Sequence, residues 1–184
     1  MHEISLHILD LVENSTGAGA TTVSVLVEED SRCNELRLRI ADNGKGMDAG
    51  LVAKVTDPFV TSRTTRKVGL GLPLMDMTTR MCGGKLHINS TPGSGTTVEA
   101  VWQLSHLDRP PLGNMAATVK AILIMNPELL FQYVHKVDDR SFSLDSGEIR
   151  AALGDLPLTQ PDVLDWIDQY LKENLSILYG GKTT

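Results

Sequence analysis

Cysteine, aromatic residues and long apolar runs are all scarce in this chain of 184 residues. Two cysteines, Cys33 and Cys82, supply neither a disulfide framework nor a zinc ligand set, so reduced thiols in a cytosol are expected. The longest apolar runs, such as residues 121–125, fall far short of the roughly 20 residues that a membrane-spanning helix needs. No signal-peptide pattern opens the chain. The sequence therefore predicts a soluble cytoplasmic protein without a membrane partner.

Positive charge is also in deficit. The chain has 17 Lys and Arg residues against 23 Asp and Glu residues, a net charge of −6 with neutral histidines. This balance argues against a nucleic-acid partner, because phosphate contacts require an excess of basic side chains. One local exception is a basic cluster of Arg63, Arg66 and Lys67. The 41% of hydrophobic residues allow a packed core, and the length suits one ordinary domain with a small appendage.

Apolar spacing in the first hundred residues predicts an alternation of helices and strands. Helices are expected at residues 4–15, 48–55 and 71–81, and strands at 23–27, 36–40, 86–88 and 98–104. The first two strands should pair antiparallel, and residues 56–67 lack periodicity and predict a loop. Helices with mostly antiparallel strands in this order are typical of an α+β fold, a two-layer α/β sandwich.

A break in the pattern at Pro110 and Pro111 predicts a domain boundary. We place a main domain at residues 1–106, a linker at 107–113 and a small α/β module at 114–184 whose role the sequence does not indicate. In that module helices are expected at 115–124, 146–153 and 162–178, and strands at 130–137 and 141–144. Pro161 stands where the first turn of a helix accepts proline.

Four short blocks in the main domain carry the functional signal. They are Asp10-Leu-Val-Glu-Asn14, Asp42-Asn-Gly44-Lys-Gly46-Met47, Gly69-Leu70-Gly71-Leu72 and Gly93-Ser-Gly95-Thr-Thr97. In this order they resemble the N, G1, G2 and G3 boxes of the GHKL superfamily, which includes gyrase, the large heat-shock chaperone, histidine kinases and MutL. The resemblance covers residues 3–104. It implies the Bergerat ATP-binding fold, with ATP and Mg²⁺ as ligands.

The first block combines an amide and a carboxylate on one helix face. Asn14 offers an amide oxygen, and the resemblance implies that it holds Mg²⁺ against the phosphates. Asp10 lies one turn earlier, so both side chains project the same way. In the ATPases of the superfamily a glutamate at that spacing orients the attacking water, which makes Asp10 the candidate catalytic residue. It is one methylene shorter, which weakens the case for efficient hydrolysis. His7 either points towards the phosphates or is a structural helix residue.

The second block follows directly on a predicted strand. A carboxylate fixed at that point, Asp42, can accept a hydrogen bond from the adenine amino group. A buried acceptor left unpaired against guanine would cost about 1–3 kcal/mol, which would give base selectivity. Gly44 and Gly46 would let the backbone pass close to the purine, with Met47 beside them. We expect Asp42→Ala to abolish ATP binding and to leave the fold intact.

The third and fourth blocks supply candidate phosphate and base contacts. Glycines that open a helix free backbone amides for phosphate, which applies to Gly69, Leu70, Gly71 and Leu72. No Gly-Lys-Ser/Thr follows and a third glycine is missing, so neither a Walker A loop nor a dinucleotide fingerprint is present. Thr97 is a candidate adenine contact, either directly or through water, with strand packing as the alternative.

The segment ahead of the third block resembles a kinase lid. Asp57-Pro-Phe-Val-Thr-Ser-Arg63 is similar to the lead-in of nitrogen-regulator-type histidine kinases, which implies a short ATP lid. In that lid Arg63, Arg66 and Lys67 would reach the phosphates electrostatically, or form an ordinary exposed basic loop.

Three functions fit these blocks. The first is a protein kinase subunit in signal transduction, transferring the γ-phosphate to a histidine or serine of a partner protein. Almost nothing precedes Glu3, so the phosphate acceptor is expected on another chain or in residues 114–184, the tail. The second is a nucleotide-dependent binding module, in which ATP closes the lid and exposes or orders a surface for a partner. The third is a slow ATPase that uses Asp10 as its base.

Overall fold

The protein is described by a computed structural model that covers residues 3–55 and 71–181. The helices are α1 (Ile4–Gly17), α2 (Ala49–Val55), α3 (Gly71–Met81), α4 (Met115–Met125), α5 (Ser146–Leu153) and α6 (Pro161–Leu178). The strands are β1 (Thr22–Asp30), β2 (Glu35–Asp42), β3 (Lys85–Thr91), β4 (Gly95–Gln103), β5 (Leu130–Val137) and β6 (Arg140–Asp145). Each helix and strand expected from the sequence is present, and the predicted α+β class is confirmed. The expected loop at 56–67 lies outside the described residues.

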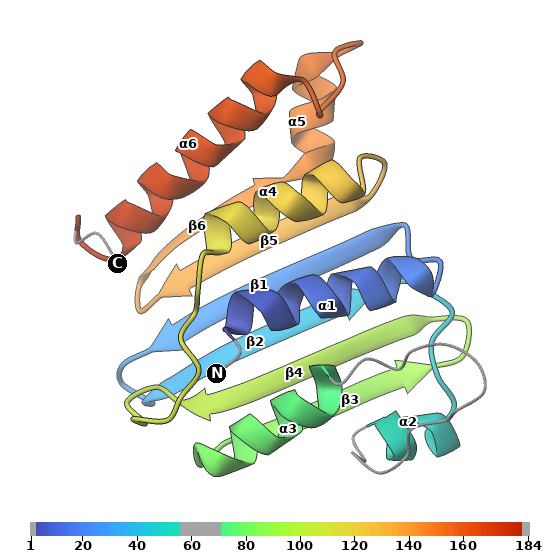
Figure 1. Cartoon of the computed structure of the whole chain (residues 1–184), viewed down its shortest axis with the longest axis vertical. Helices are drawn as coiled ribbons and strands as arrows, with labels where there is room; N and C mark the ends of the chain where they lie inside the picture. The colour runs from blue at the N-terminus through green and yellow to red at the C-terminus, as the bar shows by residue number, and fades with distance from the viewer. Residues whose placement is uncertain (1–2, 56–70, 182–184) are drawn as a thin grey trace.

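All six strands belong to one sheet, in the order β3-β4-β2-β1-β5-β6 (Figure 1). β1 and β2 pair antiparallel, as predicted, with Val25 opposite Ile40. The β2–β4, β3–β4 and β5–β6 pairs are also antiparallel, whereas β5 runs parallel to β1. A parallel neighbour requires a crossover connection, and the segment that contains α4 lies between β4 and β5 in the chain.

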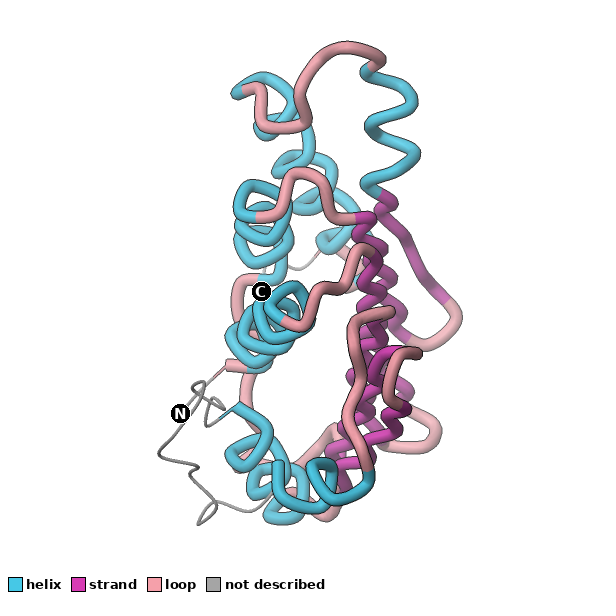
Figure 2. The backbone as a smooth tube through the Cα atoms, turned by 90° about the vertical axis from the view of Figure 1, so that its right-hand side faces the viewer, coloured by secondary structure: helices cyan, strands magenta, loops and turns pink. Residues whose placement is uncertain are grey.

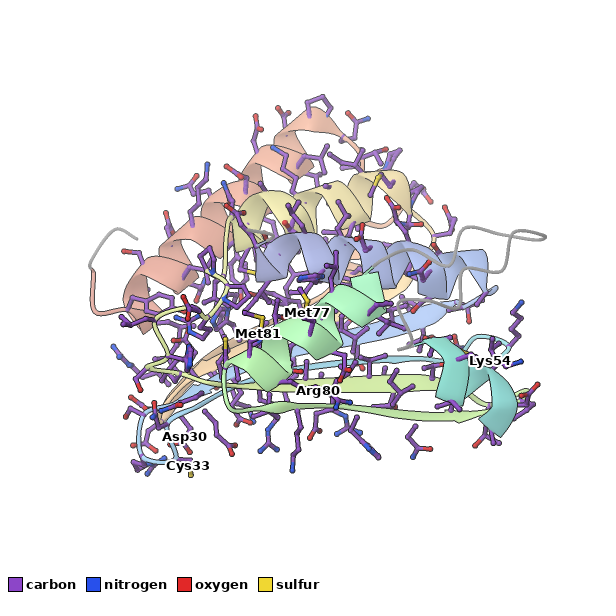
Figure 3. The ribbon with its side chains drawn as sticks, turned by 60° about the horizontal axis from the view of Figure 1, so that its bottom comes forward. Asp30, Cys33, Lys54, Met77, Arg80 and Met81 are labelled. Atoms are coloured by element: carbon purple, nitrogen blue, oxygen red, sulfur yellow. The ribbon has the colours of Figure 1, made fainter. Side chains whose placement is uncertain are left out.

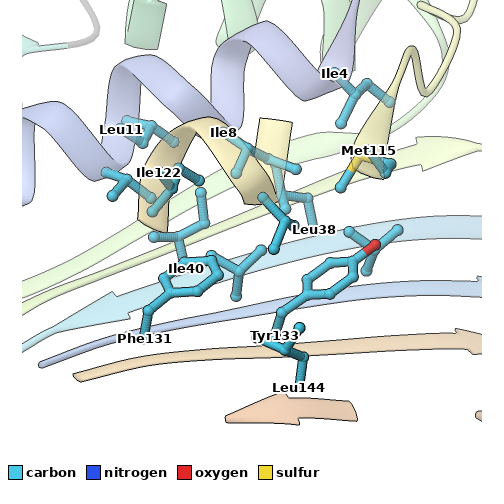
Figure 4. Close-up of a cluster of buried hydrophobic side chains, with 14 of the residues drawn as sticks. Ile4, Ile8, Leu11, Leu38, Ile40, Met115, Ile122, Phe131, Tyr133 and Leu144 are labelled. Carbon is cyan, nitrogen blue, oxygen red and sulfur yellow. The ribbon is translucent and has the colours of Figure 1, made fainter. Parts of the chain in front are cut away.

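The sheet has helices on one face, which gives two layers (Figure 2). α1 and α3 pack on the strands of the first half of the chain, and α4 packs between α1 and α6. Side chains at helical spacing on α1, namely Ile4, Ile8 and Leu11, face the strands in a common core with Phe131 and Tyr133 of β5 (Figure 4). Burying one such side chain contributes roughly 1.5–3 kcal/mol, so this face fixes α1 on the sheet.

The segment 107–113 returns to the start of α1 and caps it. The N-cap residue Glu3 makes no side-chain capping hydrogen bond. Instead the amide of Ile4 donates to the carbonyl of Pro111 and the amide of Ser5 donates to that of Leu112, both at 2.9 Å. The first amides of a helix have no partners within the helix, so these carbonyls satisfy donors that would otherwise require water.

The C-terminal third shares the sheet and the core with the rest of the chain. β5 adds directly to β1, and buried side chains of α4 and α6, such as Ile122 and Ile167, belong to the same cluster as those of α1. The division of the chain at 107–113 into separate folding units stays a prediction. As a consequence of this packing, the tail supports the helix that carries Asp10 and Asn14.

Several peripheral side chains can be followed in Figure 3. Met75 on α3 is fully buried, whereas Met77 and Met81 are 50% and 62% exposed. Both cysteines are free: Cys82 is buried, and Cys33 is exposed in the β1–β2 turn, at the other end of the sheet from α2. The charge of Asp30 beside Cys33 raises the pKa of the Cys33 thiol.

Among the described helices, none is long and apolar enough to cross a bilayer.

Candidate functional site

A cavity of about 360 Å³ lies between α1, the end of β2, α2, the start of α3 and β4. This volume is within the range of small-molecule sites, roughly 300–1,000 Å³. The lining residues are Leu11, Glu13, Asn14, Ser15, Gly17, Ala18, Ile40, Asp42, Lys45, Gly46, Met47, Leu51, Val55, Leu72, Thr96 and Val98. All four sequence blocks thus contribute residues to one cavity, the third through Leu72 and the fourth through Thr96.

The cavity combines apolar walls with a few polar groups. Seven of the sixteen lining residues are leucine, isoleucine, valine or methionine, and they come from α1, β2, the turn after it, α2, α3 and β4. The polar members come from α1, from the end of β2 and the turn after it, and from β4. An apolar cavity with a few convergent polar groups is typical of a small-molecule binding site.

Asp42 is held in place by three hydrogen bonds. The Ser15 hydroxyl donates to its Oδ2 at 2.8 Å, and the Gly44 and Thr96 amides donate to its Oδ1 at 2.8 and 3.3 Å. Its backbone ends β2, opposite Val23 of β1 and Thr96 of β4. Because donors come from α1, the following turn and β4, the carboxylate has a fixed direction and presents acceptor lone pairs to the cavity.

The turn after Asp42 is tied to its surroundings on both sides. Asn43 Oδ1 accepts hydrogen bonds from the Thr21 and Thr22 amides, each at 2.9 Å. The Lys45 amide donates to the Ala18 carbonyl at 3.1 Å, and the Lys45 carbonyl accepts from the Gly93 amide at 2.7 Å. This turn therefore connects the end of α1 with the β3–β4 hairpin, and it forms the rim of the cavity.

The glycines of this turn have a packing role in the structure. Gly46 has φ +64°, and a Cβ atom there would lie 2.0 Å from the Thr91 carbonyl oxygen. Gly95 has φ +100°, and its Cβ would lie 1.9 Å from the Asp42 carbonyl oxygen. Only glycine fits such contacts. Gly44 and Gly46 were expected to let the backbone pass close to a purine, and the contact that the structure shows at Gly46 is with the β3–β4 hairpin.

Asp10 lies beside the start of α3. A Cβ atom on Gly71, the first residue of α3, would lie 3.5 Å from Asp10 Oδ2. Asp10 and Asn14 are both exposed on α1, and Asn14 lines the cavity. His7, one turn before Asp10, is buried with 3% exposure. Asn14 and Leu72, the second residue of α3, line the same cavity, so the N-terminal turn of α3 with its free backbone amides borders the cavity.

The β4 strand brings Thr96, and not Thr97, to the cavity. Side chains alternate along a strand, and Thr96 shares its face with Val98, Ala100 and Trp102. The same alternation was visible in the sequence, since those three residues form the apolar series that predicts the strand. Ser15, Lys45 and Leu51, which are not among the site residues predicted from the sequence, also line the cavity. Nothing in the local sequence marks Ser15, because its partner Asp42 is 27 residues away.

Other expected site residues are placed less directly or not at all. Gly44 is buried beneath Asp42 and does not line the cavity. Five candidates lie outside the described residues, namely Arg63, Arg66, Lys67, Gly69 and Leu70. In residues 3–55 and 71–181 no three His, Cys, Asp or Glu side chains cluster as metal ligands. Magnesium commonly uses only one or two protein oxygens and completes its shell with phosphate and water, so one amide such as that of Asn14 fits this pattern.

Comparison with known proteins identifies the family. Residues 2–106 match the family described as "Histidine kinase-, DNA gyrase B-, and HSP90-like ATPase". The match covers more than half of the chain, and the chain belongs to this family. It contains a GHKL ATP-binding domain, related to histidine kinases and to MutL-type ATPases. The fold and the four-block resemblance predicted from the sequence are therefore confirmed.

Individual relatives match only parts of this chain. The sensor protein kinase FleS of Pseudomonas aeruginosa is 37% identical over 97 residues, which are 53% of this chain and 24% of the relative. The DNA mismatch repair protein MutL of Gemmatimonas aurantiaca is 40% identical over 58 residues, which are 32% of this chain and 9% of the relative. The chain thus corresponds to less than a quarter of the length of these relatives.

A solved structure supports the architecture alone. The N-terminal domain of a DNA repair protein superposes with a TM-score of 0.54 and 16% sequence identity. The superposition covers 79% of this chain and 53% of the other. Because it extends over more of the chain than the family match does, strands and helices after residue 106 also take part in the shared fold.

Proposed function

We propose that the protein binds Mg-ATP in this cavity and transfers the γ-phosphate to a histidine or serine of a partner protein. The observation that carries the proposal is the convergence of Asn14, Asp42, Met47 and Leu72 on one cavity. They come from three blocks that are far apart in sequence, and a chance set of motifs would not meet in this way. The sensor kinase relative supports phosphotransfer as the outcome of binding.

By its chemistry, adenine fits the part of the cavity at Asp42, which we call the base end. Asp42 presents fixed acceptor oxygens, and the exocyclic amino group of adenine is a donor. Apolar side chains such as Ile40 and Val98 supply flat surface for the ring faces. Guanine would place a carbonyl oxygen where adenine places its amino group, and two facing acceptors would leave Asp42 without a partner.

The phosphates belong beside Asn14 and the start of α3, which we call the phosphate end of the cavity. Asn14 would hold Mg²⁺ through its amide oxygen, and the amides at Gly71 and Leu72 would face phosphate oxygens. Bound Mg²⁺ neutralises phosphate charge and orients the chain of phosphates for transfer. The protein's own contribution is positioning, to which the basic residues Arg63, Arg66 and Lys67 would add charge.

One observation favours slow ATP hydrolysis as a second candidate. Asp10 Oδ2 lies close to the first residue of α3, where a carboxylate can reach a water molecule near the phosphates. The same placement lets an acceptor hydroxyl or imidazole of a partner take the position of that water. Asp10 alone therefore does not separate the two reactions, and an ATP-driven binding switch without chemistry is the remaining alternative.

A γ-labelling experiment separates these functions. The full chain is incubated with γ-³²P-ATP and Mg²⁺, alone and with an extract of the source cells, and labelled protein and free phosphate are measured together. Label that appears on a protein and depends on Asn14 and Asp42 would support phosphotransfer. Its acid lability would distinguish phosphohistidine from phosphoserine. The matched control is Ser24→Ala, which alters a β1 residue that does not line the cavity.

Each alternative has its own signature in that experiment. Free phosphate without labelled protein would support an ATPase and not a kinase. Loss of phosphate release in Asp10→Asn would then identify Asp10 as the base. Tight binding with neither product would support the switch. Calorimetry that detects no binding of adenosine triphosphate or diphosphate would contradict all three.

A further inference from the structure

We propose that Ser90, which does not itself line the cavity, is a positioning residue that sets the donor direction of the Thr96 hydroxyl towards the bound base. The inference rests on the proposed nucleotide site and assigns a further residue to its base selectivity. Ser90 lies near the end of β3, beside Thr96 of β4, its antiparallel partner. It is half-buried and belongs to none of the four sequence blocks.

The Ser90 hydroxyl is the centre of a small hydrogen-bond network. Its Oγ accepts from the Met47 amide at 2.8 Å. It lies 3.0 Å from the Gly95 carbonyl oxygen and 2.8 Å from Thr96 Oγ1. Met47 and Thr96 both line the cavity, so Ser90 connects two of its walls from behind.

Counting hydrogens leaves two arrangements of this network. A serine hydroxyl has one hydrogen to donate and two lone pairs to accept with. If Ser90 donates to the Gly95 carbonyl, Thr96 must donate to Ser90 and then offers only lone pairs elsewhere. If Ser90 donates to Thr96 Oγ1, the hydrogen of Thr96 is released. The second arrangement converts Thr96 into a donor for a ligand in the cavity.

Adenine requires that second arrangement. Its amino group, a donor, is flanked on each side by a ring nitrogen, N1 or N7, which is an acceptor. Asp42 supplies the acceptor for the amino group, and the Thr96 amide bonded to Asp42 Oδ1 places Thr96 next to it. A hydroxyl donor beside a carboxylate acceptor complements the adenine edge. Ser90 sets this direction because, when it donates to Thr96 Oγ1, the Thr96 hydrogen is turned away from Ser90 and towards the cavity.

The test uses adenine analogues that lack one ring nitrogen. Affinities for ATP, 1-deaza-ATP and 7-deaza-ATP are measured by calorimetry on the full chain, for the wild type, Ser90→Ala and Ser90→Thr. Ser90→Ala loses the donor that orients the Thr96 hydroxyl, and a loss of up to one net hydrogen bond predicts roughly threefold to tenfold weaker ATP binding. Ser90→Thr, which keeps a hydroxyl, should recover most of the affinity. With the analogue that lacks the relevant nitrogen, the wild type and Ser90→Ala should agree to within about twofold.

Two controls separate positioning from general damage. Ser24→Ala removes a β1 hydroxyl whose residue does not line the cavity, and it should leave all three affinities unchanged. In a Thr96→Val background the Ser90→Ala change should have no further effect on ATP binding, since its target hydroxyl is gone. Thermal unfolding of each variant checks that the fold is kept.

The outcomes are distinguishable from failure of the nucleotide site. A Ser90→Ala penalty that is equal for ATP and both analogues, or that persists in Thr96→Val, would overturn the positioning role and leave ATP binding intact. No penalty at all would do the same. A wild-type chain that fails to bind ATP would overturn the proposed site, and this inference with it.

Discussion

The Ser15 hydroxyl on α1 donates a hydrogen bond of 2.8 Å to Asp42 Oδ2 at the end of β2. Ser15 Oγ is also 3.0 Å from the Leu11 carbonyl, so its single hydrogen has two acceptors within reach. Asn14, the proposed magnesium ligand, is the adjacent residue on α1. One turn of α1 thus carries both the Asn14 amide, the proposed magnesium ligand, and the Ser15 hydroxyl that orients the Asp42 carboxylate.

Ser15→Ala should weaken ATP binding by roughly threefold to tenfold, because Asp42 loses the donor that fixes one of its oxygens. Stability should fall by about 1 kcal/mol, the usual net contribution of one hydrogen bond. Thr16→Ala is the matched control, because the Thr16 hydroxyl bonds the Glu13 carbonyl on the exposed side of the same helix. Titration calorimetry and urea unfolding measure the two quantities. Equal nucleotide affinities in both variants would contradict the role of Ser15.

Asp42→Asn should bind ATP at least tenfold more weakly than the wild type and keep the fold. The amide retains one oxygen for the Gly44 and Thr96 amides, but it presents a donor to the cavity in place of an acceptor. Asp42→Ala removes the acceptor for three hydrogen bonds, and it should also cost about 1–3 kcal/mol of stability. This revises the expectation that Asp42→Ala leaves the fold untouched. Unfolding curves of both variants beside their ATP affinities provide the check.

Asn14→Ala should weaken Mg-ATP binding far more than binding of ATP in the presence of EDTA. Asn14 is exposed, so the substitution should change stability by less than about 0.5 kcal/mol. The metal-free measurement is an internal control for damage to the base end of the cavity. Equal losses with and without magnesium would argue against a metal role for Asn14.

Gly46→Ala should destabilise the protein more than Gly93→Ala. Both glycines have positive φ, +64° and +78°, so each substitution carries a conformational cost of about 1–2 kcal/mol. A Cβ on Gly46 also meets the Thr91 carbonyl at 2.0 Å, whereas nothing lies within 4 Å of a Cβ on Gly93. The difference in urea midpoints isolates the packing contact. Equal midpoints would mean that the turn and the hairpin can separate at no cost.

Tyr179→Phe should destabilise the protein in a pH-dependent way. Burial by itself would raise the pKa of the Glu29 carboxyl, but His135, with Nε2 3.9 Å away, and the Tyr179 hydroxyl outweigh it and lower the pKa. A lowered folded-state pKa gives stability that is present above the unfolded pKa, about 4.3, and is lost as the pH falls through the folded value. Tyr179→Phe removes part of that stability, roughly 1.5–3 kcal/mol at pH 7.

The matched control for this variant is Tyr170→Phe on α6, the helix that ends just before Tyr179. The Tyr170 hydroxyl donates to the Ser143 carbonyl at 2.9 Å, a neutral acceptor, so the cost of removing it should not vary between pH 7 and pH 3. The cost of Tyr179→Phe should shrink over the same range. Urea unfolding at a series of pH values compares them, and parallel curves would contradict the assigned charge on Glu29.

Local patterns in the sequence determined the elements and the family. The apolar spacing of Ile4, Ile8 and Leu11 predicts α1, and the alternation of Val23, Val25 and Val27 predicts β1, because helices and strands expose a fixed periodicity to a core. Motif residues close together in the chain, such as Asp10 and Asn14, are placed on one face by helix geometry alone. These relations depend on a few consecutive residues, and they need no knowledge of the rest of the fold.

Only the tertiary structure decided which distant groups meet. The parallel pairing of β5 with β1 joins the tail to the main sheet, and the hydrogen bonds of Ser15 to Asp42 and of Ser90 to Thr96 cross between elements. The pairing of β4 with β2 places Thr96 opposite Asp42, which is the part of the Thr96 position that strand alternation by itself does not give. Contacts between segments separated by tens of residues depend on strand order and helix packing, and local periodicity carries no information on either.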